Sequence, residues 1–415
     1  MNKRILYVSN HLRGPGGAAG TRSWQHAKVL SETWDVTVVL PETDPVTTQP
    51  VTSDTYAGLD LGRVDVRPVR SITLDRSRKW KRVLFYIVGA MGQFWVGLKT
   101  RNVVCVLAMS LPVTSLLVAT ILAVFKRVPL IVDVRDLPFE TAIEMGYLRN
   151  GPISRFALWL ENTCLRRARM VLTNSPHYKP MLEARGIKAS CIVVAPIGYD
   201  GFEAPNAAEV SKWRQDIQSR FTASKPSVLG VYCGTFGHVV EVETVLEAAG
   251  LLKDRPDIGF VCVGSGQRLA EYRAMVADQD LNVIFLGRVP KNAIQPICRA
   301  GDFCLYSAKD GKMSVAMLGN KVFDYLGAER PVIYCGPDSA VSEIIDELGA
   351  GLVSPAGGAQ ALAVNIVRLG DDPALRTELG ANASGYRAAG YTAEASARVL
   401  VRRIQDILDE IGTQR

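Results

Sequence analysis

The amino-acid sequence predicts an α/β protein of two domains, each built on a doubly wound parallel sheet. The chain has 415 residues, which exceeds one ordinary hydrophobic core and suits two. Short Val/Ile-rich runs alternate with helical stretches in both halves. A segment rich in Pro, Gly, Ala and Asn, residues 196–209, separates the two series. We expect domains at 1–198 and 199–390, and a helix over 391–415 that packs back towards the first domain.

The strands are expected at short runs rich in β-branched residues. In the first half these runs begin at residues 5, 36, 64, 103, 130, 170 and 191, and in the second half at 228, 259, 283, 303, 332 and 351. Parallel strands need right-handed crossover connections, so helices are expected on both faces of each sheet. Ligands of such sheets bind at the carboxyl ends of the strands, which predicts a combined site in a cleft between the two domains.

The composition is that of a globular protein without disordered or collagen-like segments, with 48% hydrophobic and 21% charged residues. The start, "MNKRILYVSN", lacks the long apolar segment of a signal peptide, so we expect a cytoplasmic protein. The eight cysteines are dispersed without a C-x-x-C pair, which favours buried thiols over disulfides or zinc. No His, Cys and carboxylate cluster has metal-ligand spacing, and neither a metal nor a cofactor is expected.

The first half of the chain is basic. Residues 1–198 have a net charge of +12 and the remainder −5. Residues 76–101 contain seven basic residues and no acid around an apolar, aromatic centre. Such a segment can lie on an anionic membrane surface, or it can be a helix packed on its own domain with a solvated basic end.

Residues 103–125 contain no charge and are long enough to span a bilayer. We interpret them instead as a buried strand, a turn with Pro112 at the helix start, and a buried helix that ends before Pro129.

A glycine-rich loop follows the first strand. Gly16 and Gly17 precede a helix expected near Thr21, and such glycines let backbone N–H groups approach a phosphate or a sugar. Arg22 and Arg135 are expected beside this loop, as contacts for an acceptor or a phosphate. A dinucleotide-binding loop or a plain flexible turn are the alternatives, although the three residues between the strand and Gly14 do not fit the dinucleotide fingerprint.

Further candidates follow other strands. Asp136, after the fifth strand, can orient or deprotonate a hydroxyl group, while Arg135 beside it can instead form an ion pair that only holds the loop. In the second half, the loops that follow three strands are expected to bind phosphate and base through Gly234, Thr235, Gly237, His238, Gly264, Gly266 and Arg288.

Together the segments "GPGGAAGTR", "VRDLPFE", "VYCGTFG", "VGSGQ" and "NKVFDYLGAERPVI" resemble the GT-B retaining glycosyltransferases of family 4, especially the bacterial branch that builds O-antigen and capsule sugars. The resemblance spans essentially the whole chain. It implies two Rossmann-like domains that face a cleft. It also implies metal-independent transfer of a sugar from a nucleotide diphosphate, usually UDP, to a hydroxyl of a lipid-linked or other cell-envelope glycan. Nucleic acid is not an expected partner.

The resemblance also assigns roles on the donor side. Lys321 matches the lysine that lies near the donor diphosphate, and Asp324 matches the acid that binds the ribose hydroxyls. Ala316 replaces the first glutamate of the family's E-x7-E pair, and Thr235 replaces an arginine. Because of these departures, an epimerase or hydrolase of the same shape, and a non-catalytic membrane partner that binds nucleotide sugar, stay open as alternatives.

Overall fold

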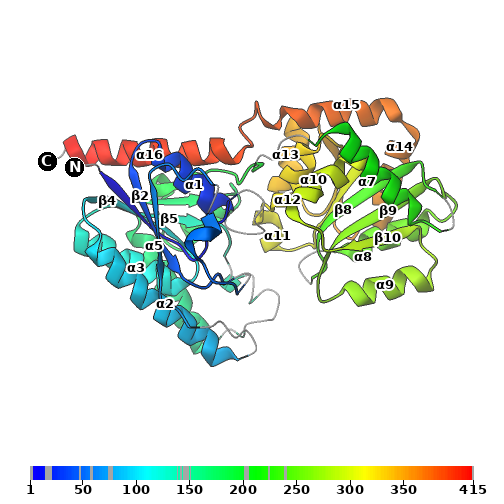
Figure 1. Ribbon diagram of the computed structural model, residues 1–415. Coiled ribbons are helices and arrows are strands. Elements are labelled where there is room, and N and C mark those ends of the chain that lie inside the picture. The colour runs from blue at the N-terminus through cyan, green and yellow to red at the C-terminus, as the bar shows by residue number, and fades with distance from the viewer. Residues whose placement is uncertain are drawn as a thin grey trace. The chain divides into compact units, whose positions relative to one another are not determined.

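The computed structural model describes residues 3–14, 21–45, 48–56, 59–72, 78–137, 139–140, 143, 149, 151–200, 205–222, 225–237 and 241–413. The chain forms two compact units (Figure 1). Unit 1 contains residues Met1–Pro196 and Ala393–Arg415, and unit 2 contains residues Ile197–Thr392.

Unit 1 is built on a parallel sheet of seven strands in the order β3-β2-β1-β4-β5-β6-β7. The strands are β1 (Arg4–Val8), β2 (Asp35–Pro41), β3 (Val64–Val69), β4 (Val103–Met109), β5 (Leu130–Val134), β6 (Met170–Thr173) and β7 (Ile192–Val194). The central strands β1, β4 and β5 are almost entirely buried, as expected for a sheet that is covered on both faces.

Helices cover both faces of this sheet. They are α1 (Thr21–Ser31), α2 (Lys79–Lys99), α3 (Val113–Lys126), α5 (Pro152–Arg167), α6 (Tyr178–Ala184) and α16 (Ala393–Thr413), with short 3-10 helices at Ser53–Tyr56 and Ala189–Cys191. Helices α1 and α16 pack on each other over one face, while α3 packs between α2 and α5 over the other (Figure 1). The C-terminal helix therefore completes the core of unit 1.

The uncharged segment 103–125 folds as predicted, into strand β4 and helix α3. The Lys126 ammonium, at the end of α3, donates hydrogen bonds to the carbonyl oxygens of Leu98 and Thr100, which belong to the C-terminal end of α2. Among the helices in the described part of the chain, none combines the length and the hydropathy needed to cross a bilayer.

Unit 2 repeats the architecture with six parallel strands in the order β10-β9-β8-β11-β12-β13. The strands are β8 (Val228–Thr235), β9 (Ile258–Ser265), β10 (Val283–Gly287), β11 (Phe303–Ser307), β12 (Val332–Cys335) and β13 (Gly351–Ser354). Each of the predicted strand positions in both halves is a strand, which confirms the two-domain α/β prediction.

The helices of unit 2 also form two layers. They are α7 (Ala207–Ser219), α8 (Val242–Leu251), α9 (Leu269–Asp278), α10 (Lys291–Ala300), α11 (Lys312–Ala316), α12 (Asn320–Gly327), α13 (Ala340–Leu348), α14 (Ala359–Asp371) and α15 (Pro373–Ala383), with a 3-10 helix at Ser384–Tyr386. One core cluster joins α7, α10, α12 and α13 to the sheet, and another joins α8, α9 and α14 to its opposite face.

Candidate active site

The strand order of unit 2 reverses between β8 and β11. From β8 the chain proceeds to β9 and β10 on one side, and then to β11, β12 and β13 on the other. Ligands of doubly wound sheets bind outside the carboxyl ends of the strands at such a reversal. A ligand of unit 2 is therefore expected beside the residues that follow β8 and β11.

The side chain of Lys321, on α12, extends to this reversal. Its Nζ atom lies 3.4 Å from the hydroxyl oxygen of Tyr232 on β8. It also lies 5.3 Å from the ring centroids of both Tyr232 and Tyr306, the latter on β11. Among the described residues, no carboxylate forms an ion pair with this ammonium group. Lys321 is thus a partly buried cation beside two tyrosine rings, without a carboxylate partner among the described residues.

The surroundings of Lys321 change its acidity. Burial, which disfavours the charged form, lowers the pKa of Lys321 to about 8, with a small opposing effect from Cys233. Burial also raises the pKa of Tyr232, so the phenol stays neutral and cannot act as the counter-ion. Neither the Tyr232 phenol nor a described carboxylate neutralises the charge of the Lys321 ammonium. An anionic ligand beside Lys321 could therefore form an ion pair with it.

Glycines make room for this lysine. A Cβ atom on Gly234, at the end of β8, would lie 2.2 Å from the Cε atom of Lys321. Gly264, at the end of β9, has a φ of +142° and would place a Cβ atom 1.7 Å from the carbonyl oxygen of Gly234. Only glycine fits at position 264, where the obstacle is backbone, whereas a side chain at position 234 would displace the end of Lys321.

Asp324 lies one turn after Lys321 on α12 and forms an ion pair with Lys291. The Lys291 Nζ atom is 2.6 Å from the Asp324 Oδ1 atom. Burial raises the pKa of Asp324, and Lys291 opposes that change. Burial would lower the pKa of Lys291, but the Asp324 and Asp200 carboxylates outweigh it and raise the pKa. The Asp324 carboxylate remains able to accept hydrogen bonds through its second oxygen atom, Oδ2.

The other donor-side candidates lie at the same edge of the sheet. Thr235 is exposed at the end of β8, and Gly266 lies against the backbone of Phe236. Gly237 follows in the same loop with open space around it, and Arg288 is exposed directly after β10, the outermost strand on that side. His238 lies outside the described residues.

In unit 1, Arg22 is buried and makes contacts within the core. Its guanidinium group lies 3.1 Å from the Asp133 carboxylate, and it donates hydrogen bonds to the Ala195 carbonyl oxygen and the Ser396 hydroxyl oxygen. The residue is only 4% exposed. Arg22 therefore joins α1, β5 and α16, which differs from the expectation that it would contact an acceptor or a phosphate.

Arg135 also binds this carboxylate. Its Nε atom is 3.5 Å from Asp133 Oδ2, and its Nη2 atom donates to the hydroxyl of Ser23. Burial acts to raise the pKa of Asp133, but Arg22, His26 and Arg135 together lower it to about 2. Arg135 therefore forms the ion pair that was the structural alternative to a ligand contact.

Asp136 is the candidate that remains accessible in unit 1. It follows β5 and Arg135 at the carboxyl edge of the sheet, and its residue is exposed to solvent. Gly16 and Gly17 lie outside the described residues. The next acid, Glu140, forms an ion pair with Arg185, which also binds the buried Glu161. Asp136 is thus better suited than Glu140 to meet a hydroxyl group.

Sequence reasoning missed three residues of this site. Tyr232 and Tyr306 are hidden in strand runs, where a tyrosine usually signals only packing. Lys291 begins α10 directly after Pro290, and nothing in the sequence relates it to Asp324, which is 33 positions away. The one available signal was the position of both tyrosines close to the carboxyl ends of their strands.

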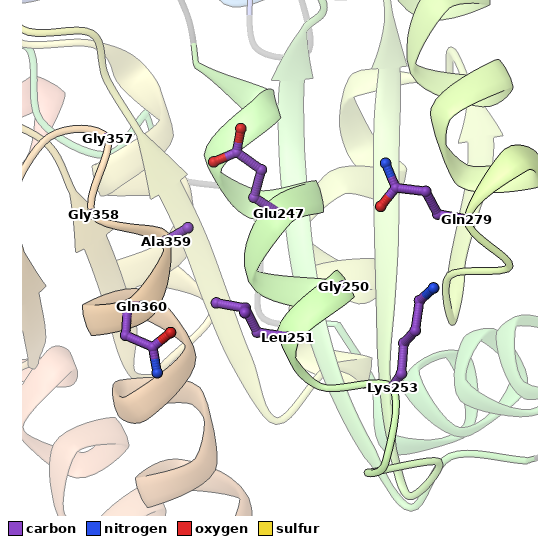
Figure 2. A pocket seen from close by; sticks show the side chains of 9 residues that line it. All are labelled: Glu247, Gly250, Leu251, Lys253, Gln279, Gly357, Gly358, Ala359 and Gln360. Carbon is purple, nitrogen blue, oxygen red and sulfur yellow. The ribbon is translucent and has the colours of Figure 1, made fainter.

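A separate pocket of about 650 Å³ lies elsewhere on unit 2, among the helices (Figure 2). Its lining residues are Glu247, Gly250, Leu251, Lys253, Gln279, Gly357, Gly358, Ala359 and Gln360, none of which was a predicted site residue. Within the described residues, no group of three or more His, Cys, Asp or Glu side chains could hold a metal ion.

Comparisons with known proteins agree with this arrangement of two domains. Residues 17–198 match the family model "Glycosyl transferase 4-like domain", and residues 228–372 match "Glycosyl transferases group 1". The alpha-D-kanosaminyltransferase of Streptomyces kanamyceticus is a relative with 23% identity over 280 residues, which cover 65% of this chain and 68% of the relative.

Solved structures share the fold over nearly the whole chain. Anabaena HepE in complex with UDP has a TM-score of 0.72 at 15% identity, covering 97% of this chain and 100% of that chain. Sucrose-phosphate synthase from Thermosynechococcus elongatus has a TM-score of 0.70 at 17% identity, covering 98% and 100%. The two domain matches, each on its own parallel-sheet unit, show that this chain is a glycosyltransferase of the GT-B type.

Proposed function

We propose that the chain transfers a sugar, with retention at the anomeric carbon and without a metal ion, from a nucleoside diphosphate to a hydroxyl group. The observation that supports this most directly is the partly buried ammonium of Lys321, which has no carboxylate partner among the described residues and lies at the strand-order reversal of unit 2. A diphosphate is the anion that such a position in a glycosyltransferase suits. The related Anabaena structure contains UDP, which favours UDP as the nucleotide.

The proposed role of Lys321 is to stabilise the leaving group. As the bond between the anomeric carbon and the phosphate oxygen breaks, negative charge grows on the diphosphate. A nearby ammonium then stabilises the transition state more than the ground state. The first turn of α12, which contains Lys321, adds the positive end of a helix dipole.

Asp324 is proposed to bind the ribose through its free carboxylate oxygen, while Lys291 holds the other oxygen. Arg288 and the loop that follows β10 are proposed to contact the base. These two assignments place the nucleoside and the diphosphate on different side chains, so each can be tested separately.

On the acceptor side, Asp136 is proposed to orient the attacking hydroxyl group. The acceptor oxygen bonds to the anomeric carbon, the phosphate oxygen departs, and that oxygen takes the acceptor proton. Asp136 therefore need not be a strong base. The acceptor is proposed to be a lipid-linked or other cell-envelope glycan.

A second candidate function is favoured by Ala316. This residue, at the end of α11, is 1% exposed and stands where the resemblance would place a glutamate. A chain without that carboxylate could bind a nucleotide sugar and not transfer it. An epimerase or hydrolase is the remaining alternative of this shape.

The test incubates the full chain with UDP-sugars labelled in the sugar, together with a membrane extract as the acceptor source and excess EDTA. Label in a larger product supports the proposed transfer. Altered or released sugar supports the epimerase or hydrolase, and binding without turnover supports the non-catalytic function. Turnover that stops in EDTA and returns with Mg²⁺ or Mn²⁺ would contradict metal independence. In the same assay Asp136→Asn should reduce transfer and leave UDP binding unchanged, with a loss on the order of 10²-fold if Asp136 acts as a general base.

A further inference from the structure

We propose that α2, α3 and α5 of unit 1 form a single docking face for an anionic lipid bilayer. This inference specifies where a lipid-linked acceptor would be met. It rests on the proposed function only for the reason why the protein would bind a membrane. The binding itself depends on side chains of unit 1 that have no part in donor chemistry.

Helix α2 exposes an apolar stripe along its whole length. The exposed residues are Trp80, Val83, Leu84, Ile87, Met91, Trp95 and Leu98. Their spacing of three and four residues places them on one side of the helix. At 1.5 Å per residue, the 21 residues of α2 extend over about 30 Å.

The opposite side of α2 is fixed to the sheet. Phe85 is fully buried, so it belongs to the inner side of α2 and not to the exposed stripe. The Gln93 amide donates a hydrogen bond of 2.8 Å to the carbonyl oxygen of Ser9, at the end of β1, and its oxygen accepts one from Ser115 on α3. The exposed stripe therefore points away from a well-anchored inner side.

Helix α5 supplies a second apolar segment that the sequence did not predict. Ile153, Phe156 and Trp159, in its first two turns, are 84%, 61% and 58% exposed. The rings of Phe156 and Trp159 stack with their centroids 5.7 Å apart. The buried residues of α5, including Cys164 and Leu165, lie on its other side.

The two stripes belong to one face of the unit. Helix α3 packs between α2 and α5 over the same face of the sheet, and it exposes Val124 and Phe125 at its end (Figure 1). Each exposed stripe lies opposite the buried side of its helix, so all point away from the sheet. Isolated exposed apolar residues are ordinary, but an array of this extent with five exposed aromatic rings on three helices indicates an interaction surface.

The basic character of this face indicates an anionic bilayer as its partner. Helices α2, α3 and α5 contain eight Lys and Arg residues, and their single acidic residue, Glu161, is buried and paired with Arg185. Two copies of this face would bring like charges together, which opposes a dimer formed through it. An anionic bilayer offers headgroups to the basic side chains and hydrocarbon to the aromatic rings, and tryptophan favours that boundary.

The position of the face suits a lipid-linked acceptor. In parallel βαβ units a helix begins near the carboxyl end of the strand before it, so Trp80, Phe156 and Trp159 lie towards the same edge of the sheet as Asp136. Docking of this face would hold that edge at the membrane surface, where the hydroxyl of a lipid-linked glycan is found.

The experiment measures co-sedimentation of the full chain with vesicles of phosphatidylcholine alone, or of phosphatidylcholine mixed with phosphatidylglycerol. Wild type should bind the mixed vesicles, bind the neutral ones weakly, and release in part at high salt. Three of the six tryptophans, Trp80, Trp95 and Trp159, lie on the face. Their emission should shift to the blue and be quenched by brominated acyl chains.

Variants test the two helices separately. Met91→Ser/Trp95→Ser and Phe156→Ser/Trp159→Ser should each weaken vesicle binding on the order of tenfold, because exposed apolar area no longer enters the bilayer. Arg82→Gln/Arg155→Gln should weaken it roughly 25-fold, about fivefold for each basic residue near the surface. The matched controls, Leu251→Ser/Val364→Ser and Lys212→Gln/Arg273→Gln, alter similarly exposed residues of unit 2 and should bind like wild type.

Several results would overturn the proposal. Wild type that fails to bind anionic vesicles is one, and face variants that sediment like the controls are another. A wild-type dimer that the serine variants convert to monomers, without vesicle binding, would assign the face to a second copy of the chain. Thermal unfolding should show that every variant folds and responds to UDP like wild type. If wild type binds vesicles but its thermal unfolding does not respond to UDP, the proposed UDP-sugar donor is contradicted. The proposed membrane docking would then still hold.

Discussion

Lys291 and Asp324 form an ion pair with 2.6 Å between Nζ and Oδ1, on side chains that are each less than one-fifth exposed. The pair joins the start of α10 to the middle of α12, so the acid assigned to the ribose is fixed before any ligand binds. Lys321, one turn earlier on α12, has no such partner in the part of the chain that the structure describes. The two charges that the sequence places three residues apart therefore have different environments, and these predict different functions.

Asp324 and Lys321 should affect the binding of different parts of the nucleotide. Asp324→Asn should weaken binding of uridine and of UDP, since both contain the ribose, and leave pyrophosphate binding unchanged. Lys321→Met should weaken binding of pyrophosphate and UDP and leave uridine unchanged. Titration calorimetry with the three ligands measures this, with Lys312→Met as an exposed lysine control. Equal losses for all three ligands in both variants would contradict the separate roles.

Lys321→Met should stabilise the folded protein while it abolishes efficient donor use. The pKa of Lys321 is lowered from 10.5 to about 8, so at neutral pH the folded state bears the cost of a buried charge. That cost is about 1–3 kcal/mol, the upper end corresponding to 1.36 kcal/mol per pKa unit and the lower end allowing for partial exposure. Urea unfolding at pH 7 checks it. Destabilisation in this variant would show that Lys321 is a structural residue.

Donor binding should depend on pH with the sign set by Lys321. The ammonium is charged below a pKa of about 8, so UDP affinity and kcat/KM should be constant at lower pH and fall as the pH rises through that value. Asp324 raises the pKa of Lys291, which therefore stays charged in this range. Lys321→Arg, which remains charged, should lose the alkaline decrease. An identical decrease in this variant would assign the titration to another group.

Gly234→Ala should impair catalysis and spare stability. The new methyl group would lie 2.2 Å from Cε and 2.8 Å from Nζ of Lys321, and the flexible end of that side chain can move away. A displacement of about 1 Å can cost on the order of 10²-fold in rate. Gly412→Ala, which meets no atom within 4 Å, is the control. In a double-mutant cycle, Gly234→Ala should add little to Lys321→Met, and full additivity would contradict the mechanism.

Asp133→Asn should destabilise unit 1 by about 3–5 kcal/mol, because Arg22 would remain buried without its counter-ion. Urea unfolding measures the loss. Arg22→Met in the same background should recover part of it, and Asp254→Asn, at an exposed position, should have little effect. Asp133→Asn with wild-type stability would mean that the interactions of Arg22 with Ala195 and Ser396 are sufficient to hold it.

The sequence determined the fold class and the position of every strand. Alternating apolar runs and helical segments specify parallel sheets because only a strand covered on both faces can bury such runs as "VVCVLA" and "LIVDV". The sequence also indicated Lys321 and Asp324 through the resemblance to family 4 glycosyltransferases, and the two residues lie three positions apart on α12. The composition of residues 76–101 similarly predicted a basic, apolar segment, which contains all of α2.

Tertiary structure decided what each charge does. Arg22 is a buried cation and Lys321 a partly buried one, yet Arg22 pairs with Asp133, 111 positions away, while Lys321 lies beside tyrosine rings and pairs with no carboxylate among the described residues. No local pattern distinguishes them, because the partner that neutralises a buried charge comes from a distant strand and is chosen by the packing of the sheet. For the same reason the sequence did not reveal the apolar stripe of α5. Cys164 and Leu165 occupy the core, so Phe156 and Trp159 lie on the outer side of the helix.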